Sequence, residues 1–300
     1  MNIREIFLEL TQKTYPHGTE HGLEPLLPGA PADEWGNYYL KLGHSSTIFT
    51  SHLDDFSKKQ EKVFHKIQDG KIHSDGTTIL GADDKAGVSL MIWMIHHQVP
   101  GLYYFFSGEE RGSIGSSAVK KNWSHHGYSR MISFDKAGYG SIVSHQSLLR
   151  TASDEFCYDL SQKFKERGMD FFTDSRGVHT DSALFLDHVP ECTNISVGYF
   201  GQHTTLEYQD MDYLQKLSQC VLDIPWDELK TRRKANTREW MGQYEPCDIV
   251  PKEKNLEPET SEEVKKKRIR KRLNIFGNTQ AGLWVDSKKI KKVRTDNTNP

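Results

Sequence analysis

Five separate segments of the sequence deliver a histidine or a carboxylate where an apolar run ends or a helix is expected to begin. Imidazole nitrogens and carboxylate oxygens are the donors that hold zinc and related divalent ions in proteins. The side chains of this kind are His52, Asp83, Glu110, Asp135 and His203. Their types and their regular placement predict a metal site.

The number of donors favours two metal ions. Two adjacent ions, ~3.5–4 Å apart, share a bridging ligand, so a shared carboxylate with two further protein ligands for each ion requires five ligands. Two carboxylates remain beside this set. Glu109 precedes Glu110 and is suited to act as general base on a metal-activated water. Asp54 follows His52 by two residues and is suited to hold its imidazole through the other ring nitrogen.

Each motif alone has an ordinary explanation. A His-x-Asp sequence is common in turns, and an Asp-Asp pair before a helix often caps its N-terminus. A Glu-Glu pair after a strand often belongs to a solvated loop, and a single histidine is usually a surface or core residue. The ordered occurrence of all these motifs near strand ends and helix starts is what favours the metal site.

The elements that must position these residues are strands that alternate with helices. Helices are predicted over residues 3–14, 84–97, 113–121, 152–167 and 211–222. Strands are predicted over residues 38–42, 47–51, 102–106, 131–134 and 194–197, with a hairpin over 62–73 that turns at Asp69-Gly70. This alternation predicts an α/β fold, a three-layer sandwich with a central mixed β-sheet flanked by helices.

The composition changes after Trp226. Residues 227–300 carry 19 Lys and Arg against 12 Asp and Glu, which leaves 20 against 29 for residues 1–226. We therefore predict a catalytic domain over residues 1–226 and a charged, basic extension over 227–300, partly disordered or docking. Its run KKKRIRKR, residues 265–272, fits a solvated charged helix, with nucleic-acid binding as the alternative.

Several classes of protein are not favoured by the composition. No stretch approaches the roughly 20 apolar residues that span a bilayer, so no membrane association is expected. The start MNIREIFLEL does not have the pattern of a secretory signal. The cysteines show neither metal-binding nor disulfide spacing, which favours reduced thiols and a cytoplasmic location. They are Cys157, Cys192, Cys220 and Cys247.

The ordered blocks SHLDD, LGADDKAG, FSGEERGSIGS, SFDKAG and QHTTLE resemble those of the co-catalytic (di-zinc) metallopeptidases, the zinc aminopeptidases and peptidase T among them. The phrase DEWGNYYLKLG, residues 33–43, is similar to the hairpin that precedes the His-x-Asp motif in these enzymes. The resemblance covers about residues 3–225. It implies a central mixed sheet, two divalent ions, and a cis peptide bond between Asp83 and Asp84.

The resemblance also implies a role for each site residue. His52 and Asp135 would hold one metal, Glu110 and His203 would hold the other, and Asp83 would bridge them. The two remaining roles are those of Glu109 as general base and Asp54 as the carboxylate that orients the first imidazole. The expected ion is Zn²⁺, with Co²⁺ or Mn²⁺ as alternatives.

The chain departs from the larger relatives, which insert a lid or dimerisation domain. The intervals from Asp54 to Asp83 and from Asp135 to His203 are too short for one. A compact, lidless form is expected, and it lacks the lid arginine that carboxypeptidase-like relatives use on a substrate carboxylate. An aminopeptidase acting on peptides is therefore the favoured function.

Other functions remain open from the sequence. A deacylase or amidohydrolase acting on a small amide would use the same metal site, and a non-enzymatic binding protein would keep the site without turnover. A nucleic-acid-binding protein would depend on the basic run. The oligomeric state is not determined by the sequence.

Four further residues lie near the motifs. Asp181 resembles a support residue of single-domain aminopeptidases, but it also fits a helix N-cap. His179 fits a surface loop better than a transition-state donor. Tyr139 and Tyr199 are candidates to donate a hydrogen bond to a developing oxyanion, but each also fits as a packing aromatic.

Overall fold

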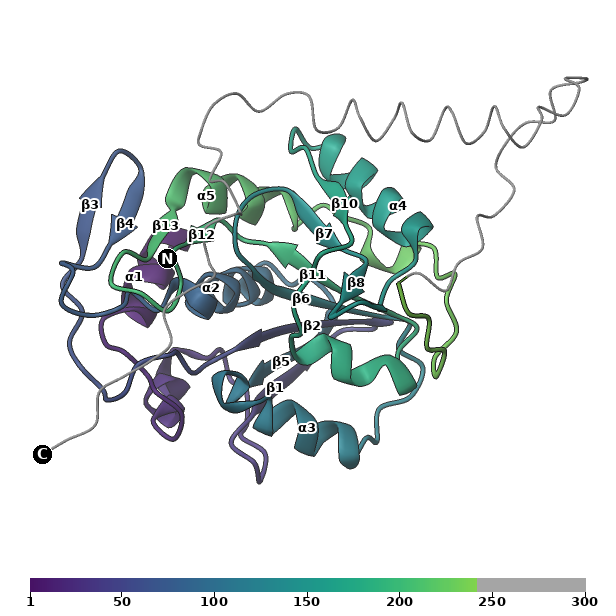
Figure 1. Ribbon diagram of the computed structural model, residues 1–300, viewed down its shortest axis with the longest axis horizontal. Coiled ribbons are helices and arrows are strands. Elements are labelled where there is room, and N and C mark those ends of the chain that lie inside the picture. The colour runs from purple at the N-terminus through teal and green to yellow at the C-terminus, as the bar shows by residue number, and fades with distance from the viewer. Residues whose placement is uncertain (242–300) are drawn as a thin grey trace, which may run out of the picture. The chain divides into compact units, whose positions relative to one another are not determined.

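The computed structural model describes residues 1–241, in which a mixed β-sheet of seven strands lies between helices on both faces (Figure 1). The strand order is β1-β5-β2-β6-β11-β7-β10. At the centre, β2 (Thr47–His52) pairs in parallel with β5 (Gly101–Phe106) and with β6 (Arg130–Lys136). The pairs β1–β5 and β11–β7 are antiparallel. The three-layer α/β fold predicted from the sequence is therefore confirmed.

The remaining elements complete the layers. The helices are α1 (Ile3–Leu10), α2 (Ala82–His96), α3 (Ile114–Lys121), α4 (Asp154–Lys165) and α5 (Met211–Cys220), with 3-10 helices η1 (Glu20–Leu26), η2 (Glu109–Arg111), η3 (Asp181–Asp187) and η4 (Trp226–Glu228). The other strands of the large sheet are β1 (Tyr38–Leu42), β7 (Ser141–Val143), β10 (Phe172–Asp174) and β11 (Glu191–Ser196). A smaller sheet contains β12 (Tyr199–Phe200), β13 (Tyr208–Asp210), β4 (Lys71–His73) and β3 (Lys66–Gln68), and a ribbon pairs β8 (His145–Gln146) with β9 (Leu149–Arg150).

The apolar strands fill a hydrophobic core on each face of the sheet, because successive side chains of a strand point to opposite faces. In β2, Ile48 belongs to one core and Phe49 to the other. The core of Phe49 includes residues of α1, α2 and α5, whereas that of Ile48 includes residues of α3 and η3. The continuous apolar runs in the sequence are explained by this burial on both faces.

Helix α2 approaches the centre of the sheet very closely at Gly87. A β-carbon there would lie 2.1 Å from the Phe134 carbonyl oxygen and 2.5 Å from Ser51 Oγ, so no larger residue fits. Asp84 Oδ1 accepts a hydrogen bond from Gly87 N at 3.2 Å, and Asp84, not Asp83, supports the first regular turn. The start of α2 is thereby held against the ends of β2 and β6.

The N-terminal helix is shorter than the periodicity predicts, ending at Leu10 instead of near residue 14. Beyond it, Thr14 N donates to the Glu61 carbonyl at 2.9 Å, and Val63 N donates to the Gln12 carbonyl at 2.9 Å. These pairings take the Gln12 carbonyl and the Thr14 nitrogen, so the helix does not continue through residue 14. The hairpin prediction is confirmed, with positive φ of 49° at Asp69 and 73° at Gly70.

Residues 227–241 are joined to the preceding part of the chain through polar contacts. Asp227 Oδ1 accepts from Ser46 N at 2.8 Å and from Arg130 Nη1 at 3.2 Å. The buried Glu191 carboxylate accepts from the backbone nitrogen of Arg233 at 2.9 Å. The predicted extension over residues 227–300 stays a prediction, because the structure describes the chain only to residue 241. Cys247 and the basic run 265–272 lie outside the described residues.

Candidate metal centre

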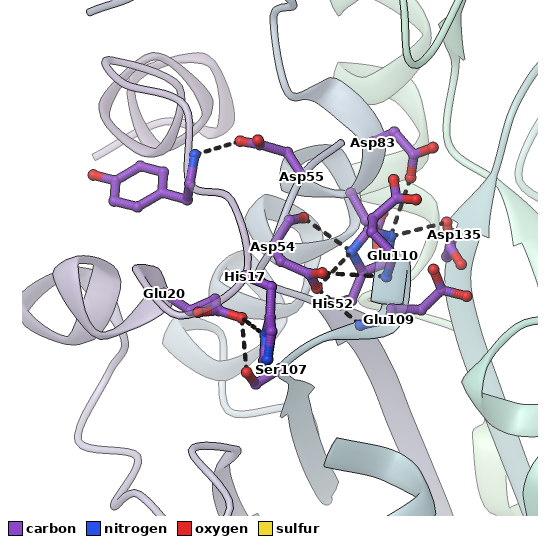
Figure 2. A network of polar contacts seen from close by, with 12 residues as sticks. His17, Glu20, His52, Asp54, Asp55, Asp83, Ser107, Glu109, Glu110 and Asp135 are labelled. Atoms are coloured by element: carbon purple, nitrogen blue, oxygen red, sulfur yellow. Dashed lines mark hydrogen bonds and ion pairs between the residues drawn. The ribbon is translucent and has the colours of Figure 1, made fainter. Parts of the chain in front are cut away.

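The five predicted metal ligands come together at one edge of the sheet, although they belong to five different segments. Figure 2 labels four of them, His52, Asp83, Glu110 and Asp135. His52 ends β2, and Asp135 lies near the end of the neighbouring strand β6. Asp83 lies at the start of α2, and Glu110 lies in η2 directly after β5. His203 lies in the loop between β12 and β13.

The Asp83 carboxylate lies between the two imidazoles. Its Oδ1 is 3.1 Å from His52 Nε2, and its Oδ2 is 3.2 Å from His203 Nε2. The peptide bond between Asp83 and Asp84 is cis, as the resemblance implies. One carboxylate oxygen is thus directed to each histidine.

The two outer carboxylates are divided between the same two histidines. Asp135 Oδ1 is 3.7 Å from His52 Nε2, and Glu110 Oε1 is 2.7 Å from His203 Nε2. The arrangement is therefore two groups of donors, one around each imidazole, that have Asp83 in common.

The donors fit divalent ions. Donor atoms of His52, Asp83 and Glu110 lie within 4.8 Å of one another, as do those of His52, Asp84 and Asp135. Glu110 Oε1 is buried and lies 2.7 Å from His203 Nε2, but this contact does not have the geometry of a hydrogen bond. A buried carboxylate oxygen is stabilised by a hydrogen bond or by a cation. A metal ion is suited both to this oxygen and to the imidazole beside it.

The carboxylates gathered at this site shift the pKa values of several of its side chains. The carboxylates of Asp83 and Glu110 raise the pKa of His203 to about 10. Burial opposes ionisation of Asp83, but hydrogen bonds from both imidazoles outweigh it and lower the pKa of this carboxyl. Burial, with the nearby charge of Asp135, raises the pKa of Glu109 to about 9. Bound cations would favour the ionised carboxylates and the neutral imidazoles.

Asp54 connects two of the ligand-bearing segments. Its Oδ1 accepts from Glu109 N at 3.0 Å and its Oδ2 from Glu110 N at 3.2 Å. The nearest partner of His52 Nδ1 is the Asp54 backbone carbonyl at 3.0 Å, and the Asp54 carboxylate is 3.5 Å away. The backbone carbonyl and the carboxylate of Asp54 therefore both help to orient the His52 imidazole. The same carboxylate also fixes the turn that carries Glu109 and Glu110.

The sequence did not identify several residues that hold the ligands in place. The buried Glu207 accepts from the backbone nitrogens of Leu80, Gly81 and Asp83 at 2.8–2.9 Å. This glutamate is part of the block QHTTLE, so its nearness to His203 in the sequence was the available signal.

Asp135 has its own supporting side chains. Thr180 Oγ1 donates to its Oδ2 at 2.5 Å, and Tyr199 OH donates to its Oδ1 at 3.1 Å. Asn194 Oδ1 accepts from its backbone nitrogen at 2.9 Å. Tyr199 is thus bound to a site carboxylate, whereas Tyr139 OH donates to Asp210 at 2.6 Å.

Asp181 and His179 have different surroundings. Asp181 is buried, accepts a hydrogen bond from Ser116 Oγ, and begins η3. Burial raises the pKa of Asp181 to about 7. His179 is exposed, as expected for a surface loop.

A second group of donors lies beside the centre but fits a metal poorly. Donor atoms of His17, Glu20 and Asp54 lie within 4.8 Å of one another. Glu20 Oε1 is already bonded by Ser107 Oγ at 2.7 Å and lies 2.8 Å from His17 Nδ1, as Figure 2 shows. These carboxylates have protein partners, so this group is better explained as a structural network.

Solved structures of several peptidases share this fold. Aminopeptidase PepT from Bacillus cereus superimposes with a TM-score of 0.63 at 19% identity, over 74% of this chain and 96% of that one. A tripeptidase from Staphylococcus aureus subsp. aureus Mu50 gives 0.62 at 17% identity, over 75% and 97%. An aminopeptidase from the archaeon Desulfurococcus kamchatkensis gives 0.55 at 16% identity, over 75% and 94%.

Sequence comparison adds a shorter match. A segment of 83 residues is 36% identical to the uncharacterized protein YqjE of Bacillus subtilis (strain 168), and it covers 25% of this chain and 22% of that protein's length. No family model matches the chain. In residues 1–241, no helix combines the length and the apolar character needed to cross a membrane.

Proposed function

We propose that this chain is a two-metal aminopeptidase that removes N-terminal residues from peptides. The observation that carries the proposal is the Asp83 carboxylate, which presents one oxygen to His52 and the other to His203. A carboxylate placed in this way is suited to bridge two ions. The shared fold of solved structures titled aminopeptidase and tripeptidase supports a peptide substrate.

In this proposal, His52 and Asp135 would hold one ion, Glu110 and His203 would hold the other, and Asp83 would be shared. Mixed imidazole and carboxylate ligands suit Zn²⁺, with Co²⁺ or Mn²⁺ as alternatives. When bound, two such ions supply Lewis acidity at the scissile carbonyl and a water of low pKa.

Side chains of the protein would transfer the proton of the attacking water. Glu109 would take a proton from this water and return it to the leaving amine, because it adjoins the proposed ligand Glu110. Within the described residues, its carboxylate is not committed to backbone nitrogens, as those of Asp54 and Asp84 are. The backbone nitrogen of Glu109 is bound by Asp54, so the turn that carries the base is fixed. Asp54 is the positioning residue for both this turn and the His52 imidazole.

We further propose that the enzyme works in the reducing cytoplasm. Cys157, Cys192 and Cys220 are free and buried. Burial raises the pKa of the Cys157 and Cys192 thiols, which makes them unreactive.

The experiment that tests the function is a substrate panel on the full chain loaded with Zn²⁺. Aminoacyl-anilides and short peptides with a free amino group are compared with the same compounds after N-acetylation. Cleavage of the free-amino compounds alone is expected. Cleavage of the acetylated compounds alone would instead assign the site to deacylation of small amides, and no cleavage of either would contradict a hydrolase.

A further inference from the structure

An aromatic ring covers one of the proposed metal ligands. The ring of Phe56 stacks on that of His203, with centroids 4.4 Å apart and planes inclined by 15°. Phe56 remains 53% exposed. One face of the Phe56 ring thus contacts the imidazole, while much of the Phe56 side chain is accessible to solvent or to a ligand.

The loop that carries Phe56 is held firmly, so its exposure is a fixed feature of the site. The neighbouring Asp55 carboxylate accepts from Tyr15 N at 2.5 Å and from Ser57 N at 3.1 Å. The ammonium group of Lys85, 1% exposed, lies 3.7 Å from the same carboxylate. These buried polar contacts fix the backbone on both sides of the aromatic side chain.

Two more exposed apolar side chains are close in sequence to site residues: Ile114 at the start of α3 and Leu206 in the loop between β12 and β13. Ile114 is 44% exposed, and its backbone nitrogen donates to the Gly108 carbonyl at 3.0 Å, directly before Glu109. Leu206 is 79% exposed and lies three residues after His203. Its backbone nitrogen donates to Thr204 Oγ1 at 3.2 Å, and the next residue, Glu207, is buried.

We propose that the exposed ring of Phe56, stacked on the His203 imidazole, receives an apolar side chain of the substrate's N-terminal residue, with Ile114 and Leu206 as further contacts. This inference rests on the proposed function and adds the class of substrate: peptides that begin with a leucine-like or aromatic residue. Apolar surface next to a reaction centre gains free energy when a substrate covers it. Phe56, Ile114 and Leu206 offer no partner to a charged side chain, which would lose its hydration there without compensation.

The experiment compares the wild-type chain with F56A and F56L on four aminoacyl-anilides, those of leucine, phenylalanine, glutamate and lysine. Y158A serves as the matched control, because Tyr158 is 64% exposed on α4 and has no place in the site. The zinc content of every variant is measured by elemental analysis, so that loss of the stacked His203 ligand is seen separately from loss of substrate binding.

The wild type is expected to prefer the leucine and phenylalanine compounds. F56A should lower kcat/KM on these two by roughly 10-fold or more, mainly through KM, with unchanged zinc content and a much smaller effect on glutamate and lysine. F56L should recover part of the loss on the leucine compound, and Y158A should match the wild type.

Two results would overturn the inference. A wild type that cleaves charged and apolar compounds equally well would do so, and so would an F56A variant that loses activity on all four compounds to the same degree. If no aminoacyl compound is cleaved at all, the proposed function fails together with the inference, so the two failures are distinguishable.

Discussion

Glu207 Oε1 accepts a hydrogen bond from the backbone nitrogen of Asp83 at 2.9 Å. The carboxylate directly before β13 therefore fixes the loop that carries the proposed bridging ligand. Its other oxygen accepts from two further backbone nitrogens of that loop. Glu207 is 1% exposed, and this burial raises its pKa to about 7.

Replacing this glutamate should destabilise the protein and weaken metal binding. In E207Q, the amide has a single oxygen acceptor, so buried N–H groups of residues 80–83 lose a partner. A loss of about 1–3 kcal/mol in the free energy of unfolding is expected at pH 7. Urea denaturation measures it, with E228Q as control, since Glu228 is exposed. Equal stability of E207Q and wild type would contradict a stabilising role of the hydrogen bonds between Glu207 and the backbone of residues 80–83.

The assignment of Glu109 as general base predicts an inactive protein that still binds its metals. E109Q keeps the shape of the side chain but cannot accept the proton, so kcat should fall by roughly 10²–10⁴-fold. Zinc content by elemental analysis should stay at the wild-type value. Activity near the wild-type rate would rule out the assignment.

Asp83 should be the ligand whose loss affects both metals. D83A removes the carboxylate that faces both His52 and His203. The zinc retained after dialysis should therefore fall by more than one ion per chain, whereas H203A should affect one ion. D170N, a change at an exposed aspartate, is the matched control. If D83A retains as much zinc as this control, the carboxylate is not a shared ligand.

The segment after residue 226 should contribute to stability in a pH-dependent way. Burial opposes ionisation of Asp227, but hydrogen bonds from Ser46 and Ser45 and the charge of Arg130 outweigh it, so the pKa is lowered in the folded state. The stabilisation is therefore present above the unfolded pKa of about 3.9 and is lost as pH falls through the folded value.

D227N tests this contact. Because the Asp227 side chain is 45% exposed, the loss should be limited to about 1 kcal/mol at pH 7. Urea denaturation at pH 7 and at pH 3 should show a difference from the wild type that shrinks at the lower pH. A difference of the same size at both pH values would contradict the role of the charge.

Most residues of the candidate metal centre could be predicted from the sequence, because metal binding depends on residue type and on the order of the motifs. The five proposed ligands each lie at or near the end of a strand or the start of a helix, and parallel strands bring such positions to one edge. They are His52, Asp83, Glu110, Asp135 and His203. The fold could be predicted for the same reason, since runs buried on both faces mark central strands.

The supporting contacts could not be predicted in this way. Thr180 is 45 residues from Asp135, and Glu207 is 124 residues from Asp83. Threonine and glutamate are common surface residues, so nothing local distinguishes Thr180, and the only signal for Glu207 is its place in the block QHTTLE. The early end of α1 has the same cause, because residues 11–14 pair with residues 61–63, which local periodicity does not reveal.

The central claim is tested most directly by the metal content of the full chain after removal of bound ions by a chelator and reconstitution with Zn²⁺. Elemental analysis should find about two zinc ions per chain. Activity on free-amino substrates should be absent in the stripped protein and return as the second ion is bound. One ion per chain with full activity, or none under zinc-replete conditions, would contradict a two-metal centre built on Asp83.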